Sequence, residues 1–186
     1  MKTLLGFTLI MLLCTGVAVG QVSQAGSIGI FMDPGGTDCN LWDQVPGLLT
    51  FYCVHVLTPC ATASQFSAPM PACMTPTVYL SDGGYFGVTI GNSQTGVAIG
   101  YGTPQAAPIT ILSIQYFGQG LTTPCCIYPV LPDPNVPSGQ IEVVDCANNL
   151  LYATGGTGIV NPNGSCQCDV ATEESTWGKV KALYSE

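Results

Sequence analysis

Short apolar runs alternate with turn-forming clusters along most of the chain. The runs are rich in Val, Ile, Thr, Tyr and Phe, which strands prefer. The segments between them, such as DPGGTD, SDGG and PDPNVPSG, supply the positive-φ and fixed-φ positions at which a chain reverses. The pattern predicts strands over Ser27–Met32, Leu48–Leu57, Ser64–Ala68, Thr77–Leu80, Tyr85–Ile90, Gly96–Tyr101, Ile109–Phe117, Ile127–Leu131, Gln140–Val144 and Leu150–Ala153.

Several runs alternate with a period of two residues. In TFYCVHV, Phe51, Cys53 and His55 share one face of a strand and their neighbours share the other. The segment ITILSIQYF, residues 109–117, alternates in the same way. No segment of the body has a sustained helical period. Closely spaced strands without helices between them predict an all-β fold, an antiparallel β-sandwich, with a closed barrel as the second choice.

The two ends of the chain differ from this body. MKTLLGFTLIMLLCTGVAVGQ has one positive charge, an apolar run and small residues before Gln21, so we expect residues 1–20 to be a cleaved signal peptide. A lipid anchor at Cys14 is the alternative, although Leu13 is larger than a lipobox allows. The apolar run is too short for a membrane span, and no later stretch is a candidate helix span. The β-domain is expected over residues 21–170.

Residues 171–186 form a tail with a helical pattern. Its apolar side chains recur at positions that share one face of a helix: Trp177, Val180, Leu183 and Tyr184. Lys179 and Lys181 lie off this stripe. We expect a short C-terminal amphipathic helix that needs a partner surface, because about ten residues are marginal alone in water. The tail either docks on its own body or binds a sorting or assembly partner, and the second reading is favoured.

Positive charge is almost absent from the protein. The chain has 11 Asp and Glu against 3 Lys and Arg, and nothing between Thr3 and Gly178 is basic. Such a body cannot neutralise phosphates, which excludes nucleic acid as a partner and disfavours anionic membranes. Its high apolar, Gly and Pro content indicates a compact, turn-rich fold rather than disorder.

Nine cysteines remain after the predicted cleavage, and in an exported chain they are expected to form disulfides. They are Cys39, Cys53, Cys60, Cys73, Cys125, Cys126, Cys146, Cys166 and Cys168. Nine is an odd number, so at least one thiol is free or pairs between molecules. The adjacent Cys125 and Cys126 are expected to bond to two different partners. A loop closed by Cys53 and Cys60 is one option for the pairing.

The sequence gives little evidence for a catalytic site or a zinc site. His55 is the single histidine, and no Gly-x-Ser-x-Gly elbow accompanies it, so we expect a histidine on a strand face. A zinc site built from Cys53, His55, Cys60 and Cys73 is possible by residue type. Its spacing matches no common zinc motif, and disulfides are preferred.

Acidic loops suggest other chemistry. Calcium is a weak candidate cofactor at Asp33, Asp38 and Asp43, without EF-hand spacing. A glycoside hydrolase would use two of the carboxylates Asp33, Asp38, Asp43, Asp82, Asp133, Glu142 and Asp145. A carbohydrate-binding site would use the exposed aromatics among Trp42, Tyr85 and Tyr101.

Several stretches resemble a group of uncharacterised exported bacterial proteins. These stretches are the tail ESTWGKVKALY, GSIGIFMDPGGTDCNL, LLTFYCVHVLTPCATASQF, VVDC and NPNGSCQCDV. The resemblance implies secretion and a Cys-rich β-sandwich, and no catalytic residue. A looser likeness, carried by LLTFYCVHV and the short SQF strand, is to cohesin-type and immunoglobulin-like sandwiches. It is an analogy of fold.

Taken together, these observations favour a non-enzymatic exported protein. We expect a secreted β-sandwich that acts at or outside the cell envelope as an adhesion, assembly or surface component with a protein partner. A secreted module that binds carbohydrate or another small ligand is the alternative, and a hydrolase is less favoured.

Overall fold

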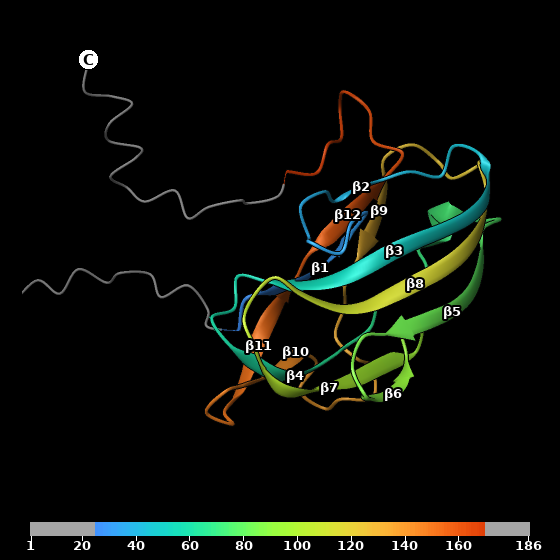
Figure 1. Cartoon of the computed structure of the whole chain (residues 1–186). Coiled ribbons are helices and arrows are strands. Elements are labelled where there is room, and N and C mark those ends of the chain that lie inside the picture. Colours follow the sequence, from blue (N-terminus) through green and yellow to red (C-terminus); the bar gives the residue numbers. More distant parts are fainter. Residues whose placement is uncertain (1–24, 170–186) are drawn as a thin grey trace, which may run out of the picture.

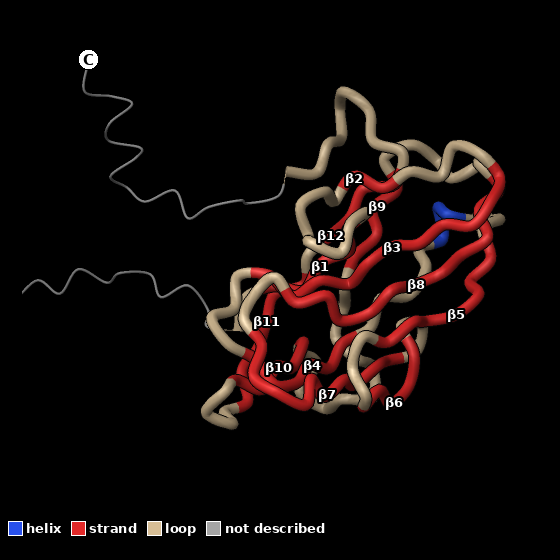
Figure 2. The backbone as a smooth tube through the Cα atoms, in the orientation of Figure 1, coloured by secondary structure: helices blue, strands red, loops and turns tan. Residues whose placement is uncertain are grey.

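The computed structural model describes residues 25–169, which consist of strands, turns and one short 3-10 helix (Figures 1 and 2). The elements are β1 Ser27–Phe31, β2 Asn40–Leu41, β3 Pro46–Val56, β4 Ala61–Phe66, η1 Ala72–Met74, β5 Val78–Gly84, β6 Val88–Asn92, β7 Gly96–Gln105, β8 Ile109–Gln119, β9 Cys126–Pro129, β10 Ile141–Asp145, β11 Leu150–Gly155 and β12 Thr157–Val160. The expected signal peptide and the expected tail helix lie outside the described residues.

The strands form a β-sandwich, as the sequence predicts. One layer has the order β5-β8-β3-β1 and the other β11-β10-β4-β7-β6 (Figure 1). All neighbours within each layer are antiparallel, and a short parallel pairing of β1 with β11 joins the two layers. Strands β5 and β6 are the ends of this nine-stranded arrangement, so the sheet is open rather than a closed barrel.

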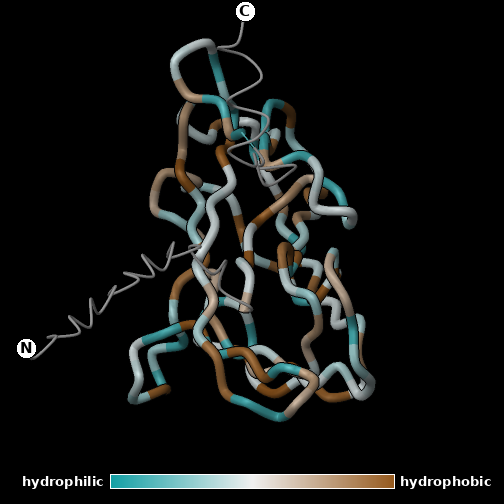
Figure 3. The backbone as a smooth tube through the Cα atoms, turned by 90° about the vertical axis from the view of Figure 1, so that its left-hand side faces the viewer, coloured by the Kyte–Doolittle hydropathy of each residue, from teal (hydrophilic) through white to brown (hydrophobic). Residues whose placement is uncertain are grey.

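The core lies between the two layers. From β3, the side chains of Phe51, Cys53 and His55 point inward and are fully buried, as the alternation of TFYCVHV predicts. The opposite layer contributes Phe66 from β4 and Ile99 from β7 to the same core. In Figure 3 the hydrophilic segments lie mostly in the connections between strands, where backbone groups can reach water.

One register detail departs from the sequence pattern. Strict alternation through residues 109–117 is wrong, because a β-bulge lies opposite the step from Cys53 to Val54. Ile109 pairs with His55, whereas Leu112 pairs with Cys53, and all four of these side chains are buried. A bulge adds one residue to a strand and reverses which face the following residues occupy. The extra residue lets Ile111 and Leu112 both be buried.

A second, three-stranded sheet was not predicted. It has the order β2-β12-β9, with β12 parallel to β2 and antiparallel to β9. The segment that becomes β12 follows two glycines and contains a third, so its local sequence is typical of a turn. Strand β2 has two residues and no local signal. Both strands exist because tertiary contacts bring β12 beside β9 and β2 beside β12.

Four disulfides connect distant segments. They are Cys39–Cys168, Cys60–Cys146, Cys73–Cys126 and Cys125–Cys166. The adjacent Cys125 and Cys126 bond to different partners, as expected. The suggested disulfide between Cys53 and Cys60 is wrong, because Cys60 pairs with Cys146. Disulfides that close loops of 41 to 129 residues restrict the unfolded chain strongly.

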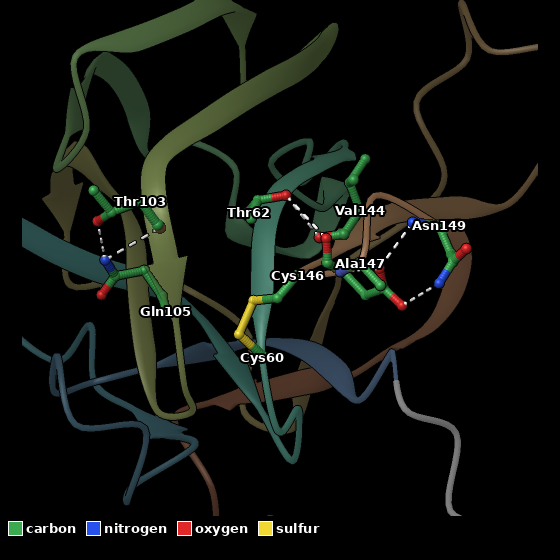
Figure 4. The surroundings of a disulfide bond; sticks show 9 residues. Cys60, Thr62, Thr103, Gln105, Val144, Cys146, Ala147 and Asn149 are labelled. Carbon is green, nitrogen blue, oxygen red and sulfur yellow. Dashed lines mark hydrogen bonds between the residues drawn. A yellow bond between two sulfur atoms is a disulfide. The ribbon is translucent and has the colours of Figure 1, made fainter.

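The Cys60–Cys146 bond shows how a disulfide reinforces the end of a layer. It joins the start of β4 to the residue after β10 (Figure 4). Beside it, the Thr62 hydroxyl donates to the carbonyl oxygens of Val144 and Asp145, at 3.2 Å in each case. The two adjacent strands are thus linked covalently and by side-chain hydrogen bonds at the point where their regular pairing shifts.

Cys53 is the unpaired cysteine among the described residues, so including it among the disulfide candidates is wrong. Its side chain is fully buried in the core, and this burial raises the pKa of the thiol. A buried thiol without a nearby cation is neutral and unreactive, because the thiolate is the reactive form. Cys53 therefore packs as an apolar side chain, and it is too deep to link two folded chains.

We predict that the folded protein, expressed without residues 1–20, will not react with a thiol reagent such as DTNB. Unfolding it in guanidinium without reductant should release one reactive thiol per chain, and Cys53→Ala should release none. Non-reducing electrophoresis should show a monomer. Rapid labelling of the folded protein, or a disulfide-linked dimer, would contradict the buried position of Cys53.

Candidate functional site

The described residues carry eight carboxylates and no Lys or Arg, so their charges must be satisfied by neutral groups. Six aspartates accept hydrogen bonds from backbone N–H groups or from hydroxyl and amide side chains. They are Asp33, Asp38, Asp43, Asp82, Asp133 and Asp145. Most of these contacts close turns, as Asp and Asn side chains commonly do.

Two examples show the effect on acidity. Hydrogen bonds from the side chain and backbone of Asn149 lower the pKa of Asp145, which closes the turn after β10. Burial by itself raises the pKa of Asp133, but hydrogen bonds from Gln65 and Asn135 outweigh it and lower the pKa. Hydrogen bonds to a carboxylate favour its charged form. Neutral donors within residues 25–169 thus favour the ionised form of these two side chains.

Among the acidic residues between positions 25 and 169, Asp43 is the most deeply buried. Its carboxylate accepts hydrogen bonds from the hydroxyls of Thr77 and Thr122 and from the backbone N–H of Gly120. Its backbone N–H and C=O both bond to the side chain of Asn161. These residues precede β5 and follow β8 and β12, so the Asp43 cluster joins four connections at one end of the sandwich.

The geometry gives the proposed calcium and hydrolase sites little support. Asp33 and Asp38 share one turn, whereas Asp43 is enclosed in its own cluster. Within residues 25–169, no group of three or more His, Cys, Asp or Glu side chains is close enough to hold a metal ion. Seven carboxylates were candidates for a hydrolase. The six aspartates among them accept the hydrogen bonds given above, and Glu142 is the remaining one. The zinc set is wrong, because Cys60 and Cys73 are in disulfides.

His55 lies in the core rather than in a catalytic triad. Its Nε2 is within hydrogen-bond distance of the carbonyl oxygen of Ala25, and its Nδ1 lies 3.4 Å from the Tyr101 hydroxyl. Burial lowers the pKa of the imidazole, although the contact with Ala25 opposes this. His55 is thus neutral and ties the segment before β1 to β3 and β7. This agrees with the sequence interpretation of a histidine on a strand face.

The three aromatic residues proposed for carbohydrate binding do not form one surface. Tyr101 is buried in the core, so its assignment to a binding platform is wrong. Tyr85 is exposed beside the outer face of β8. Trp42 is 41% exposed and lines a surface pocket whose other lining residues are Asp38, Asn40, Pro162 and Gln167. Of these three residues, Trp42 is the one that lines a pocket together with polar side chains.

The outer surface of β3, β8 and β5 is a further candidate for binding. Cross-strand pairing aligns its outward residues in three rows: Leu48, Phe117 and Val78; Thr50, Gln115 and Ser81; and Tyr52, Ser113 and Gly83. We call these nine positions the β3–β8–β5 face. Leu48, Phe117 and Val78 are 64%, 44% and 52% exposed. None of the nine side chains is charged, in a body that carries eight carboxylates.

Sequence reasoning missed this face. The signal is present in the sequence, since outward positions of a half-exposed strand are expected to be polar and Leu48 and Phe117 are not. It becomes visible only when the register is known, because the row of Leu48, Phe117 and Val78 joins residues from three separate segments. The tail residues proposed to bind a partner, Trp177, Val180, Leu183 and Tyr184, lie outside the described residues.

Among residues 25–169 there is no helix long and apolar enough to cross a membrane.

The buried imidazole predicts a pH dependence of stability. In the unfolded chain His55 binds a proton near its ordinary pKa of 6.5, whereas the folded protein binds it only at lower pH. The free energy of unfolding should therefore fall as the pH drops below about 6.5, by at most about 1.4 kcal/mol per pH unit. The comparison is urea unfolding between pH 7.5 and pH 5 for the wild type and His55→Gln.

His55→Gln should flatten this dependence, because the chain has no second histidine, and His is the side chain whose ordinary pKa lies in this range. An equal slope in both proteins would show that the folded state accepts a proton on His55 after all.

Solved structures that resemble this chain include several cohesin modules. No family model matches the sequence, and no curated protein matches it. The sixth cohesin of Acetivibrio cellulolyticus scaffoldin B is 11% identical, with a TM-score of 0.46 over 74% of this chain and 98% of that chain. The third ScaB cohesin of R. flavefaciens, solved with a dockerin, is 11% identical, with a TM-score of 0.47 over 77% and 98%. A non-cellulosomal cohesin from the archaeon Archaeoglobus fulgidus is 9% identical, with a TM-score of 0.44 over 86% and 98%. These are distant similarities of fold, and they transfer neither partner nor activity to this chain.

Proposed function

We propose that this protein is a non-enzymatic, exported β-sandwich that works at or outside the cell envelope as an adhesion, assembly or surface component. Its binding surface for a protein partner is the β3–β8–β5 face. The observation that carries this proposal is the row of exposed Leu48, Phe117 and Val78 on a surface without charge.

The composition of this face fits a protein interface. The central part of such an interface is depleted in charged residues and enriched in aromatic ones. Here Phe117 lies between Leu48 and Val78, and Thr50, Gln115 and Ser81 form a polar row beside them. The Ser81 hydroxyl donates to the Gln115 side chain at 3.3 Å, so part of this row is already ordered before a partner arrives. An ordered surface loses less entropy on binding.

Two further observations support a binding role outside the cytoplasm. The buried ionisable side chains Asp43, His55 and Cys53 are occupied by packing or by hydrogen bonds that stabilise the fold. Four disulfides are typical of proteins from oxidising compartments. The first observation favours a non-enzymatic protein, and the second favours an exported one.

The test is site-specific photocrosslinking in the host cell. A photoreactive phenylalanine analogue at position 117 should give a discrete crosslinked species in the envelope or medium fraction. The same analogue at Ile127, which is 56% exposed on β9, is the matched control and should give none. The double variant Leu48→Ser with Phe117→Ser should weaken the purified complex at least tenfold, because central apolar contacts dominate such interfaces.

Equal crosslinking at positions 117 and 127 would contradict this binding face, and so would a double variant that binds as tightly as the wild type. The thermal unfolding of the double variant should match that of the wild type, which separates loss of binding from loss of folding.

A carbohydrate-binding site at Trp42 is the second candidate. The exposed Trp42 ring lies with Asp38, Asn40 and Gln167 around one pocket. An aromatic platform with a few polar groups is the minimum that sugar recognition requires. Two hydrogen bonds with the backbone of Cys168 hold the Asn40 side chain in place. The Asp38 carboxylate accepts one hydrogen bond from the backbone N–H of Asn40.

We expect any glycan-array signal of the wild type to disappear in Trp42→Ala and to persist in Tyr85→Ala. Tyr85 is the matched control because it is also exposed but lies away from this pocket. A complete absence of glycan binding by the wild type, or a signal that survives Trp42→Ala, would rule out this site.

A further inference from the structure

A second apolar surface lies on the other layer of the sandwich. Cross-strand pairing aligns outward residues of β6, β7, β4, β10 and β11 in two adjacent rows. The first row is Val88, Gly100, Ala63, Val144 and Leu150, and the second is Ile90, Ala98, Gln65, Glu142 and Tyr152. We call this surface the β6–β11 groove.

The sizes of these side chains make the surface concave. Small residues, Gly100, Ala98 and Ala63, form the floor over the two central strands, whereas Val88 and Leu150 stand on the two sides. The resulting hollow has a volume of about 170 Å³. Cavities of about 150 Å³ in proteins take up a benzene ring, so the β6–β11 groove has room for one aromatic side chain.

Negative charge lies along the groove. Glu142 lines it directly. Asp133 accepts a hydrogen bond from Gln65 in the second row, and Asp145 follows Val144 of the first row. No Lys or Arg is present between residues 25 and 169 to balance these carboxylates. The groove therefore fits a segment that is both apolar and cationic, and it disfavours the body of a second copy, which carries the same eight carboxylates.

Outside residues 1–20, which we expect to be cleaved, one segment has this chemistry. Residues 175–185 carry Lys179 and Lys181 and no Asp or Glu, together with the aromatic residues Trp177 and Tyr184. Glutamates lie only at the two ends of the tail, before and after this stretch. We infer that residues 171–186 dock in the β6–β11 groove of their own chain, with Trp177 in the hollow and the lysines near Glu142 and its acidic neighbours. This assigns the tail to the body rather than to a sorting partner.

The connection is long enough for this docking. Asp169 lines a surface cleft with Ser27, and Ser27 pairs with Thr154 of β11. From Thr154, Leu150 is four residues along β11, about 13 Å, and Ala98 is three strands across and about two residues along, about 21 Å measured over the sheet. Residues 170–176, when extended, span about 23 Å. An extended connection therefore has the length needed to bring Trp177 to the Leu150 side of the groove.

The test follows the fluorescence of Trp177 in the intact chain. The protein has two tryptophans, so Trp42→Phe makes Trp177 the sole reporter. In this background we expect emission that is blue-shifted and protected from acrylamide. Adding Ala98→Tyr, which fills the floor of the groove, should shift the emission to the red and increase quenching at least twofold. Ala106→Tyr, on the exposed turn between β7 and β8, is the matched control and should change neither quantity.

A second experiment reverses the charge of Glu142, which lines the groove. Glu142→Lys should increase quenching of Trp177, and the effect of added salt on quenching should become smaller than in the parent protein, because attraction to Lys179 and Lys181 is lost.

Three outcomes would overturn the inference. Trp177 exposed in the parent protein would mean that the tail does not dock. Trp177 protected equally with and without Ala98→Tyr would place the tail elsewhere. Protection that disappears on dilution would assign the docked tail to a second copy.

Discussion

The central constraint on this structure is that a body with eight carboxylates and no Lys or Arg must stabilise its negative charges with neutral donors. A buried carboxylate without partners is very costly, so a carboxylate that loses contact with water needs hydrogen bonds from the protein. The chain meets this need by placing aspartates where backbone N–H groups converge, as Asp33 and Asp145 do in their turns. At the end of the sandwich, the Asp43 carboxylate likewise accepts hydrogen bonds from two threonine hydroxyls and from the Gly120 N–H. Gly118 lies close enough to this carboxylate that a Cβ there would clash.

This way of satisfying charge has consequences for function. Hydrogen bonds occupy the Asp43 carboxylate, and burial disfavours the charged forms of His55 and Cys53, so these three groups serve the fold. Disulfides add to this at the ends of the strands, as Cys60–Cys146 does for β4 and β10 (Figure 4). Besides the Trp42 pocket, the outer surface of each layer is available for recognition. One layer presents a flat, uncharged face around Phe117, and the other presents an apolar groove lined by Glu142.

The two outer surfaces suggest a division of roles. The β3–β8–β5 face has no charged side chain and suits a neutral apolar partner surface, whereas the groove suits a cationic segment. If the tail occupies the groove, the positive charge of the chain is used to cover its own acidic layer, and the β3–β8–β5 face remains open to a partner. A body without cations also repels copies of itself, which favours a heterologous partner over self-association.

Local sequence determined the class of this fold, most of its strands and the interior position of Phe51, Cys53 and His55, because alternation and turn residues act over a few neighbouring positions. It also determined that adjacent cysteines take different partners. Tertiary structure alone decided the disulfide pairing, the bulge beside Cys53, and strands β2 and β12, since each depends on which distant segments meet. The binding surfaces belong to this second group. Leu48, Phe117 and Val78 lie far apart in the sequence, and only the register of three paired strands places them in one row.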